Sequence, residues 1–352
     1  MSQFAARLVS GIPLFAGLEP RALEDIVRIF QRLTFDAGAS LVRQGRPADS
    51  AFILESGTTD VFTALPGGGE AKVAELGPGS VLGEMALLES GTRSATVIAR
   101  TPVAGYLIER DGFRMLLVQR NPAVFQIQNR ITRALCQRLR ELNAKIVVAD
   151  APENAALPLS GLTAGSSGMR RGTCSFDYRG FLPLLPVFRP FGASEIEEFA
   201  RQTEVMELDR GRILFQQGDP GAACFVVVRG ALEIAHSRDG RCHRIGVLGP
   251  GRLCGVLALI EGQLHSMSAA ARENSVLLEI EKSAFDRLFT GHDRVAAKFQ
   301  DAVNQELVRA LARTNNHLTR LISQARIRSG RRERKQADEL QRALGAQDCR
   351  AA

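Results

Sequence analysis

The 352-residue sequence has no run of about 18 apolar residues, the length that a membrane-spanning helix needs. Its first residues, Met1–Arg7, lack the apolar core of a signal peptide, so we expect a cytoplasmic protein. No Cys-x-x-Cys pair occurs among the six cysteines, and the five histidines are scattered. This spacing predicts free thiols in a reducing compartment and excludes a four-ligand zinc site.

Motifs of catalysis are also missing. The sequence contains no recognisable nucleophile–base pair, metal cluster or nucleotide-triphosphate loop, so an enzyme is the least expected class and no cofactor or metal is predicted. What the chain does have is an ordinary composition, 45% hydrophobic and 24% charged, as in soluble globular proteins. Its length suits two or three domains, each with its own core.

The net charge of +7 is concentrated near the C-terminus. Residues 326–335 contain six basic residues and one acidic residue, and they supply five of the seven net charges. Two interpretations of this basic tail, taken as 329–352, stay open. It is either a solvated helix end or a contact to nucleic acid, an anionic membrane surface or an acidic partner.

The apolar pattern changes period along the first half of the chain. Residues 1–33 show helical spacing, whereas short apolar runs separated by glycine turns follow from Leu33 and predict strands. Further strands are expected at Ala95–Ala99 and Val103–Ile108. After Asn121, a suitable N-cap, a long helix is predicted. Residues 149–180 are rich in glycine, proline and serine, which predicts a flexible linker.

The second half of the chain repeats the first. Gln44–Pro47 returns as Gln217–Pro220 at an offset of 173 residues, and Leu76–Gly79 returns as Leu248–Gly251 at an offset of 172. A near-constant offset across several turns indicates two copies of one domain, at 1–148 and 181–328. Short strands at regular spacing with helices around them predict an α+β fold, mainly β, in which an antiparallel barrel or sandwich carries flanking helices.

A second long helix is expected at 293–328. Its apolar positions step by four and three residues, which is a heptad seam of about three heptads: Leu307, Leu311, Thr314, Leu318, Leu321 and Ala325. The seam has two open interpretations. The helix packs on its own barrel, or it pairs two subunits in a homodimer.

One stretch places a carboxylate and a guanidinium nine residues apart. It reads Leu-Gly-Glu-Met-Ala-Leu over 82–87 and Arg-Ser-Ala over 93–95. Glu84 can accept a hydrogen bond from a ribose 2′-hydroxyl, and Arg93 can donate two bonds to a phosphate. Backbone N–H groups around Gly83 form an anion nest. Such a site binds a ligand without breaking bonds, although either charged residue alone would more often form a solvated ion pair.

The whole string resembles the phosphate-binding cassette of the cyclic nucleotide-binding domain family. That cassette reads Gly-Glu-x-Ala-aliphatic, a short loop, then Arg, a small residue and Ala, and residues 82–99 match it without a gap. The resemblance implies an eight-stranded jelly-roll-like barrel, with a helix after it, in each half of the chain. It also implies ligand contacts from Gly83, Glu84, Met85, Ala86, Arg93 and Ser94.

Two further expectations follow from the same resemblance. The helix after the barrel closes the pocket in this family, which makes Leu142 and Asn143 candidates to cover the base. Ser94, directly after the arginine, leaves two bases open. In some relatives a hydroxyl at this position contacts guanine and favours cGMP, whereas the Arg-Ser-Ala run looks more like the bacterial members and favours cAMP.

The second copy lacks both charged residues of the cassette. Val256 stands at the position of the carboxylate and His265 at that of the arginine. Loss of a charged hydrogen-bonding partner costs a few kcal/mol, so we expect no ordinary cyclic nucleotide binding there. A docking or dimerising role is expected for this degenerate domain.

The predicted function is a non-catalytic cAMP-binding regulatory protein of signal transduction. Ligand in the first domain would reposition the helix at 122–147 and so change contacts with the second domain or with a protein partner. The alternative is an atypical transcription regulator or a scaffold that acts through the basic tail. Neither 149–180 nor the residues after 328 suit a helix-turn-helix module, so sequence-specific DNA binding is not expected.

Overall fold

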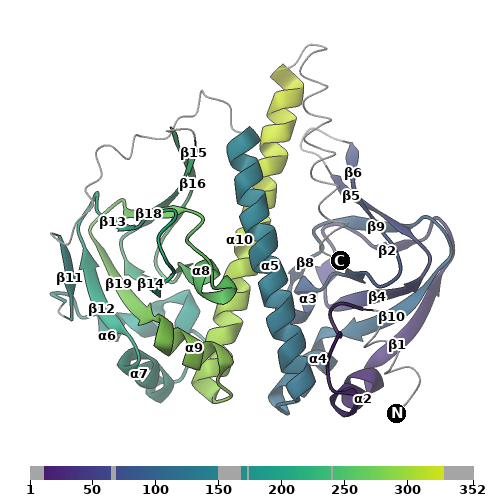
Figure 1. The fold of residues 1–352 in the computed structure, drawn as a ribbon, viewed down its shortest axis with the longest axis horizontal. Coiled ribbons are helices and arrows are strands. Elements are labelled where there is room, and N and C mark those ends of the chain that lie inside the picture. The colour runs from purple at the N-terminus through teal and green to yellow at the C-terminus, as the bar shows by residue number, and fades with distance from the viewer. Residues whose placement is uncertain (1–11, 65–68, 150–167, 173, 239–240, 329–352) are drawn as a thin grey trace. The chain divides into compact units, whose positions relative to one another are not determined.

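The computed structural model describes residues 12–64, 69–149, 168–172, 174–238 and 241–328 (Figure 1). The chain divides into two units. Unit 1 comprises Met1–Arg138 and Val308–Ala352, and unit 2 comprises Leu139–Leu307. Both divisions fall inside a long helix, α5 (Pro122–Ala149) or α10 (Arg294–Arg328). The units therefore differ from the predicted domains at 1–148 and 181–328, because the C-terminal part of each long helix groups with the other unit.

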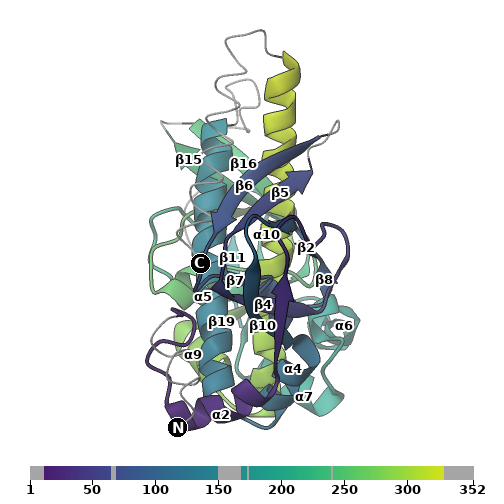
Figure 2. The same ribbon diagram turned by 90° about the vertical axis from the view of Figure 1, so that its right-hand side faces the viewer.

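Two four-stranded antiparallel sheets form the barrel of unit 1, in the orders β1-β10-β4-β7 and β2-β9-β5-β6 (Figure 2). A small two-stranded sheet pairs β3 with β8. The strands of this unit are β1 (Phe30–Phe35), β2 (Ser40–Val42), β3 (Pro47–Ala48), β4 (Ser50–Ser56), β5 (Thr59–Ala64), β6 (Glu70–Leu76), β7 (Val81–Leu82), β8 (Gly91–Thr92), β9 (Thr96–Ala99) and β10 (Val103–Glu109).

The core of this barrel comes from residues that alternate along the strands. Phe52 and Leu54 of β4 share one apolar cluster with Leu82 of β7 and Val97 of β9. In β4 and β5, inward-facing positions follow the period of two that a strand imposes on its side chains. The β7 strand is thereby held beside β4, with Phe52 opposite Leu82, and the chain leaves β7 directly into the predicted cassette.

Helices flank the strands of unit 1: α2 (Pro20–Arg28), α3 (Met85–Leu88), α4 (Arg110–Val118) and the first part of α5. The expectation of helices over 1–33 is corrected at its end, because β1 starts at Phe30 and pairs with β10 along its whole length. Residues 1–11 lie outside the described residues. The predicted N-cap is confirmed, since Asn121 Oδ1 accepts bonds from the backbone N–H groups of Ala123 and Val124, at 3.0 and 3.1 Å.

Unit 2 repeats the two sheets of this architecture. They have the orders β11-β12-β19-β14-β17 and β13-β18-β15-β16, and among the described residues of unit 1 no strand corresponds to β11. A single bridge between Pro220 and Leu264 stands where unit 1 has the β3–β8 pair. The strands are β11 (Met169–Arg171), β12 (Glu204–Leu208), β13 (Ile213–Phe215), β14 (Ala223–Arg229), β15 (Leu232–Arg238), β16 (Arg241–Leu248), β17 (Leu253–Cys254), β18 (Ser268–Ala271) and β19 (Ser275–Glu281).

The predicted α+β fold of two jelly-roll-like barrels is thus confirmed. The α-helices of unit 2 are α6 (Tyr178–Phe181), α7 (Ala193–Arg201), α8 (Val256–Glu261), α9 (Lys282–Thr290) and the first part of α10, and two 3₁₀ turns lie at Leu182–Leu184 and Pro186–Phe188. Asp293 caps α10 as Asn121 caps α5, since its Oδ1 accepts a bond from the backbone N–H of Ala296 at 2.8 Å.

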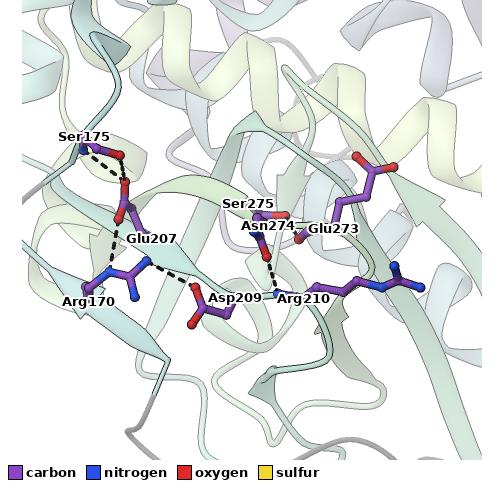
Figure 3. A network of polar contacts seen from close by, with 8 residues as sticks. All are labelled: Arg170, Ser175, Glu207, Asp209, Arg210, Glu273, Asn274 and Ser275. Atoms are coloured by element: carbon purple, nitrogen blue, oxygen red, sulfur yellow. Dashed lines mark hydrogen bonds and ion pairs between the residues drawn. The ribbon is translucent and has the colours of Figure 1, made fainter.

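The end of the predicted linker belongs to the barrel of unit 2. Met169–Arg171 forms β11, which pairs with β12, and polar contacts attach the following residues (Figure 3). Glu207 Oε1 accepts bonds from the backbone N–H and the hydroxyl of Ser175, at 3.1 and 2.9 Å, while Glu207 Oε2 accepts one from Arg170. The linker prediction for 149–180 is therefore corrected over 168–180, and residues 150–167 lie outside the described residues.

The Glu207 carboxylate is expected to make the stability of unit 2 depend on pH in the acid range. Hydrogen bonds from the backbone and hydroxyl of Ser175, helped by Arg170, lower the pKa of Glu207 from its usual 4.5 to about 2. Its contribution to stability is present above the usual pKa and is lost as the pH falls toward the folded value. We expect Glu207→Gln to lower the free energy of unfolding by about 1 kcal/mol near neutral pH.

Urea unfolding of the two proteins at neutral pH and near pH 3 measures this effect. The difference between wild type and Glu207→Gln should shrink at the lower pH, where the unfolded wild-type chain takes up the proton. Glu197→Gln is the control, because Glu197 is exposed and forms an exposed ion pair with Arg201 on its own helix. An equal loss of stability at both pH values would contradict this role of the charge.

Several other expectations can be compared with the described residues. None of the five cysteines in the described ranges is in a disulfide, as predicted, whereas Cys349 lies outside. Leu307, Leu311, Thr314 and Leu318 of the heptad seam are buried within the single chain, but from Val308 on the helix groups with unit 1 and not with its own barrel in unit 2. This burial therefore does not support the first interpretation of the seam, and the homodimer stays a prediction. No helix in the described ranges combines the length and apolarity of a bilayer crossing. Residues 329–352, the basic tail, are not among the described residues.

Candidate functional site

The turn between β7 and α3 requires a glycine at position 83. Gly83 has a φ of +69°, which side chains with a Cβ rarely adopt. A Cβ there would lie 2.3 Å from Nη1 of Arg93 and 3.2 Å from the carbonyl oxygen of Ser50. The absence of a side chain thus lets the arginine approach the backbone at the start of α3.

The backbone of Arg93 is held between two hydrogen bonds. Its N–H donates to the carbonyl of Arg46 at 2.8 Å, and its carbonyl accepts from Gly45 at 2.9 Å. From this position the side chain turns inward, and only 9% of its surface is exposed. Nη1 donates to the Ser50 carbonyl at 2.6 Å and Nη2 to the Ser50 hydroxyl at 2.9 Å. Both ends of the guanidinium are therefore directed at the start of β4.

Two carboxylates balance the charge of this arginine. Burial lowers the pKa of Arg93, and the negative charges of Asp49 and Glu84 oppose that shift. Asp49 Oδ1 lies 3.4 Å from Nη2, and its side chain is 72% exposed. Glu84 stands at the N-cap of α3. The site therefore combines a charged guanidinium, the N-terminal N–H groups of α3 and a carboxylate, which together suit a ligand with both an anionic group and a hydroxyl.

The structure brings most of the predicted site residues together. Gly83, Glu84 and Arg93 lie around one turn, and Met85 and Ala86 form the start of α3, with Ala86 buried. Ser94 follows Arg93 and is exposed. Asn143 and Leu142, the candidates to cover the base, are buried on the part of α5 that groups with unit 2.

Sequence reasoning missed Asp49 and Ser50, the two partners of the arginine. The internal repeat contains a signal that could have found them. At the offset of 173 residues they correspond to Ala222 and Ala223, so the second copy lacks the carboxylate and the hydroxyl together with the arginine. Correlated loss of three polar groups indicates that they act as one unit.

The cassette of unit 2 has the same backbone hydrogen bonds as that of unit 1 but different side chains. The N–H of His265 donates to the carbonyl of Asp219 and its carbonyl accepts from Gly218, both at 2.9 Å, as Arg93 does with Arg46 and Gly45. His265 is therefore the structural counterpart of Arg93. Gly255 has a φ of +86° and precedes α8 as Gly83 precedes α3. Val256, the counterpart of Glu84, is buried.

The His265 ring is used for packing. It stacks on the ring of Phe215, with centroids 3.8 Å apart and planes 12° apart, and the residue is 7% exposed. Burial lowers the pKa of His265; Asp219 opposes this shift and Arg140 adds to it. A neutral, stacked imidazole offers no cation to a phosphate. The described residues of this cassette thus form an apolar contact where unit 1 has a charged one.

A barrel that presents a buried arginine beside the N-terminus of a short helix defines a class of small-ligand binding module. Comparison with known families identifies it: the model of the "Cyclic nucleotide-binding domain" family matches residues 32–120 and 205–292. The chain belongs to this family and contains two such domains, as the sequence predicted.

Several relatives match most of the chain. It is 25% identical over 270 residues to a "cAMP-dependent protein kinase regulatory subunit" of Mycosarcoma maydis, which covers 73% of this chain and 42% of that protein. A subunit of the same name from Dictyostelium discoideum is 21% identical, over 84% of this chain and 76% of the relative. A solved regulatory domain of Toxoplasma gondii PKA with cAMP is 20% identical, with a TM-score of 0.30, over 81% of this chain and 91% of that one.

Proposed function

We propose that this protein is a non-catalytic cyclic nucleotide sensor in which unit 1 alone takes the ligand. One observation supports this most directly. Arg93 and His265 occupy the same backbone frame, but only Arg93 has a guanidinium that can donate two bonds to a phosphate. The ligand phosphate replaces Ser50 and Asp49 as the partner of Arg93, and Glu84 accepts the ribose 2′-hydroxyl. No metal or cofactor takes part.

The proposed ligand is cAMP rather than cGMP. Ser94 directly follows the arginine, as in the bacterial pattern, and the two relatives described above have names that refer to cAMP. The proposed pocket residues are Gly83, Glu84, Met85, Ala86, Arg93 and Ser94. Asn143 stays a candidate for covering the base.

The proposed output is a change in the position of α5 and in contacts with unit 2 or with a protein partner. Ligand binding can shift such an equilibrium only through different affinities for the two positions. A cytoplasmic location and a partner protein belong to the same proposal. The alternative, a regulator or scaffold that acts through the basic tail, depends on residues outside the described ranges.

Isothermal titration of the full chain with cAMP and with cGMP tests the proposal. We expect one binding site per chain and a lower dissociation constant for cAMP. Two equivalent sites per chain would contradict the assignment of the ligand to unit 1 alone. Absence of binding for both nucleotides would overturn the sensor function, and tighter binding of cGMP would overturn only the choice of base.

A further inference from the structure

The cassette helix of unit 1 carries an ion pair at the end opposite to its proposed ligand. Glu89 is the C-cap of α3, and its N–H donates to the carbonyl of Met85 at 3.1 Å. Its Oε1 accepts a bond from Nη2 of Arg309 at 3.3 Å. The Glu89 side chain is 13% exposed and that of Arg309 is 46% exposed. Arg309 lies on α10, in the part of that helix that belongs to unit 1.

Unit 2 contains the matching pair. Glu261, at an offset of 172 from Glu89, ends α8 and accepts a bond from Nε of Arg140 at 2.8 Å. Arg140 also donates to the carbonyl of Leu264, at 3.2 Å, in the loop before His265. These side chains are more buried than those of the first pair, 9% exposed for Glu261 and 24% for Arg140. In each unit, therefore, an arginine of a long helix binds the carboxylate at the end of the cassette helix.

The length of α3 explains why this contact can respond to a ligand. The helix has four residues, and Ala86, Leu87 and Leu88 are buried, so a displacement of one end would be transmitted to the other. A carboxylate at a helix C-terminus is unfavourable beside the partial negative charge there, and a cation offsets it. An anion bound at the N-terminus of α3 would shift the helix, and Glu89 would carry that shift to Arg309.

We propose that Arg309 is a positioning residue for the ligand site of unit 1, and that it ties residues 308–321 of α10 to the cassette helix. This inference rests on the proposed function and adds to it the element that receives the signal. The Arg140–Glu261 pair serves as the internal control, because its cassette has neither the guanidinium nor the carboxylate that would bind a nucleotide.

Hydrogen–deuterium exchange of the full chain, with and without cAMP, tests whether Arg309 couples residues 308–321 to α3. In the wild type we expect cAMP to change exchange both in α3 and in residues 308–321. In Arg309→Gln the change in α3 should persist and that in 308–321 should disappear, while cAMP affinity falls about two- to fivefold, the range of a partly exposed ion pair. Arg140→Gln should leave both the affinity and the exchange response of residues 308–321 unchanged.

Exchanging the two charges distinguishes a need for the ion pair between residues 89 and 309 from a simple loss of packing. Glu89→Arg combined with Arg309→Glu should restore the response of residues 308–321 that either change alone removes. If cAMP alters hydrogen exchange in α3 but not in residues 308–321 of the wild type, the proposed role of Arg309 is overturned and the sensor function stands. If cAMP alters neither segment, both proposals are overturned.

Discussion

Arg93→Ala is expected to weaken cAMP binding about 100-fold or more, because a hydrogen bond to a charged group contributes about 1.5–3 kcal/mol and the guanidinium would make two to one phosphate. The effect should be large because the arginine is almost fully buried and already oriented, with both Nη atoms held at Ser50. Titration calorimetry of the purified full-length variant measures the loss.

His265→Ala is the matched control for this prediction. The two residues share the same backbone frame, but the imidazole stacks on Phe215 in place of a ligand contact. We expect this variant to bind cAMP like the wild type. Arg93→Lys should fall between wild type and Arg93→Ala, since lysine keeps the charge but cannot donate in parallel from a planar group. Unchanged affinity in Arg93→Ala would show that unit 1 does not bind the phosphate through this residue.

Gly83→Ala is expected to cost at least tenfold in cAMP affinity while leaving the barrel folded. The φ of +69° penalises any Cβ by about 1–2 kcal/mol. The added methyl group would also stand 2.3 Å from Nη1 of Arg93, so the arginine must leave its position. The substitution therefore acts on the backbone of α3 and on the guanidinium at once. Calorimetric titration reports the affinity, and thermal melting reports the fold.

The equivalent change in unit 2 is the control. Gly255→Ala imposes the same backbone cost, at a φ of +86°, and its Cβ would lie 3.0 Å from the carbonyl of Ala223. It should lower the stability of unit 2 and leave cAMP affinity unchanged. A comparable loss of affinity in both variants would mean that general destabilisation, and not the cassette of unit 1, explains the result.

The repeat in the sequence predicted the barrels well because turns leave strong local signals. Glycines with positive φ, such as Gly45, Gly57 and their counterparts Gly218 and Gly230, mark the same corners in both sheets. The spacing of Gly83, Glu84 and Arg93 singled them out as a candidate site, and the structure places them around one turn; their contact with a ligand stays a prediction.

Other features could not be predicted, for physical reasons. A strand of three residues such as β11 is too short to show a period, so its pairing with β12 depends on contacts far along the chain. The apolar stripe of a long helix predicts burial but not the surface it covers, so the sequence has no signal for the division within α5 and α10. The contact of Arg93 with Ser50 depends on the fold around β4, because 43 residues separate the two.

The stack of His265 on Phe215 has a thermodynamic consequence for the chain as a whole. A barrel that fills its own pocket has the same free energy of unfolding at every nucleotide concentration. A barrel that takes a ligand gains stability with the logarithm of the ligand concentration once that exceeds the dissociation constant. The stability of unit 2 would then be constant, while the stability of unit 1 would increase with the nucleotide concentration. The unfolding of unit 2 would therefore provide a reference within the same chain against which the stability of unit 1 can be compared.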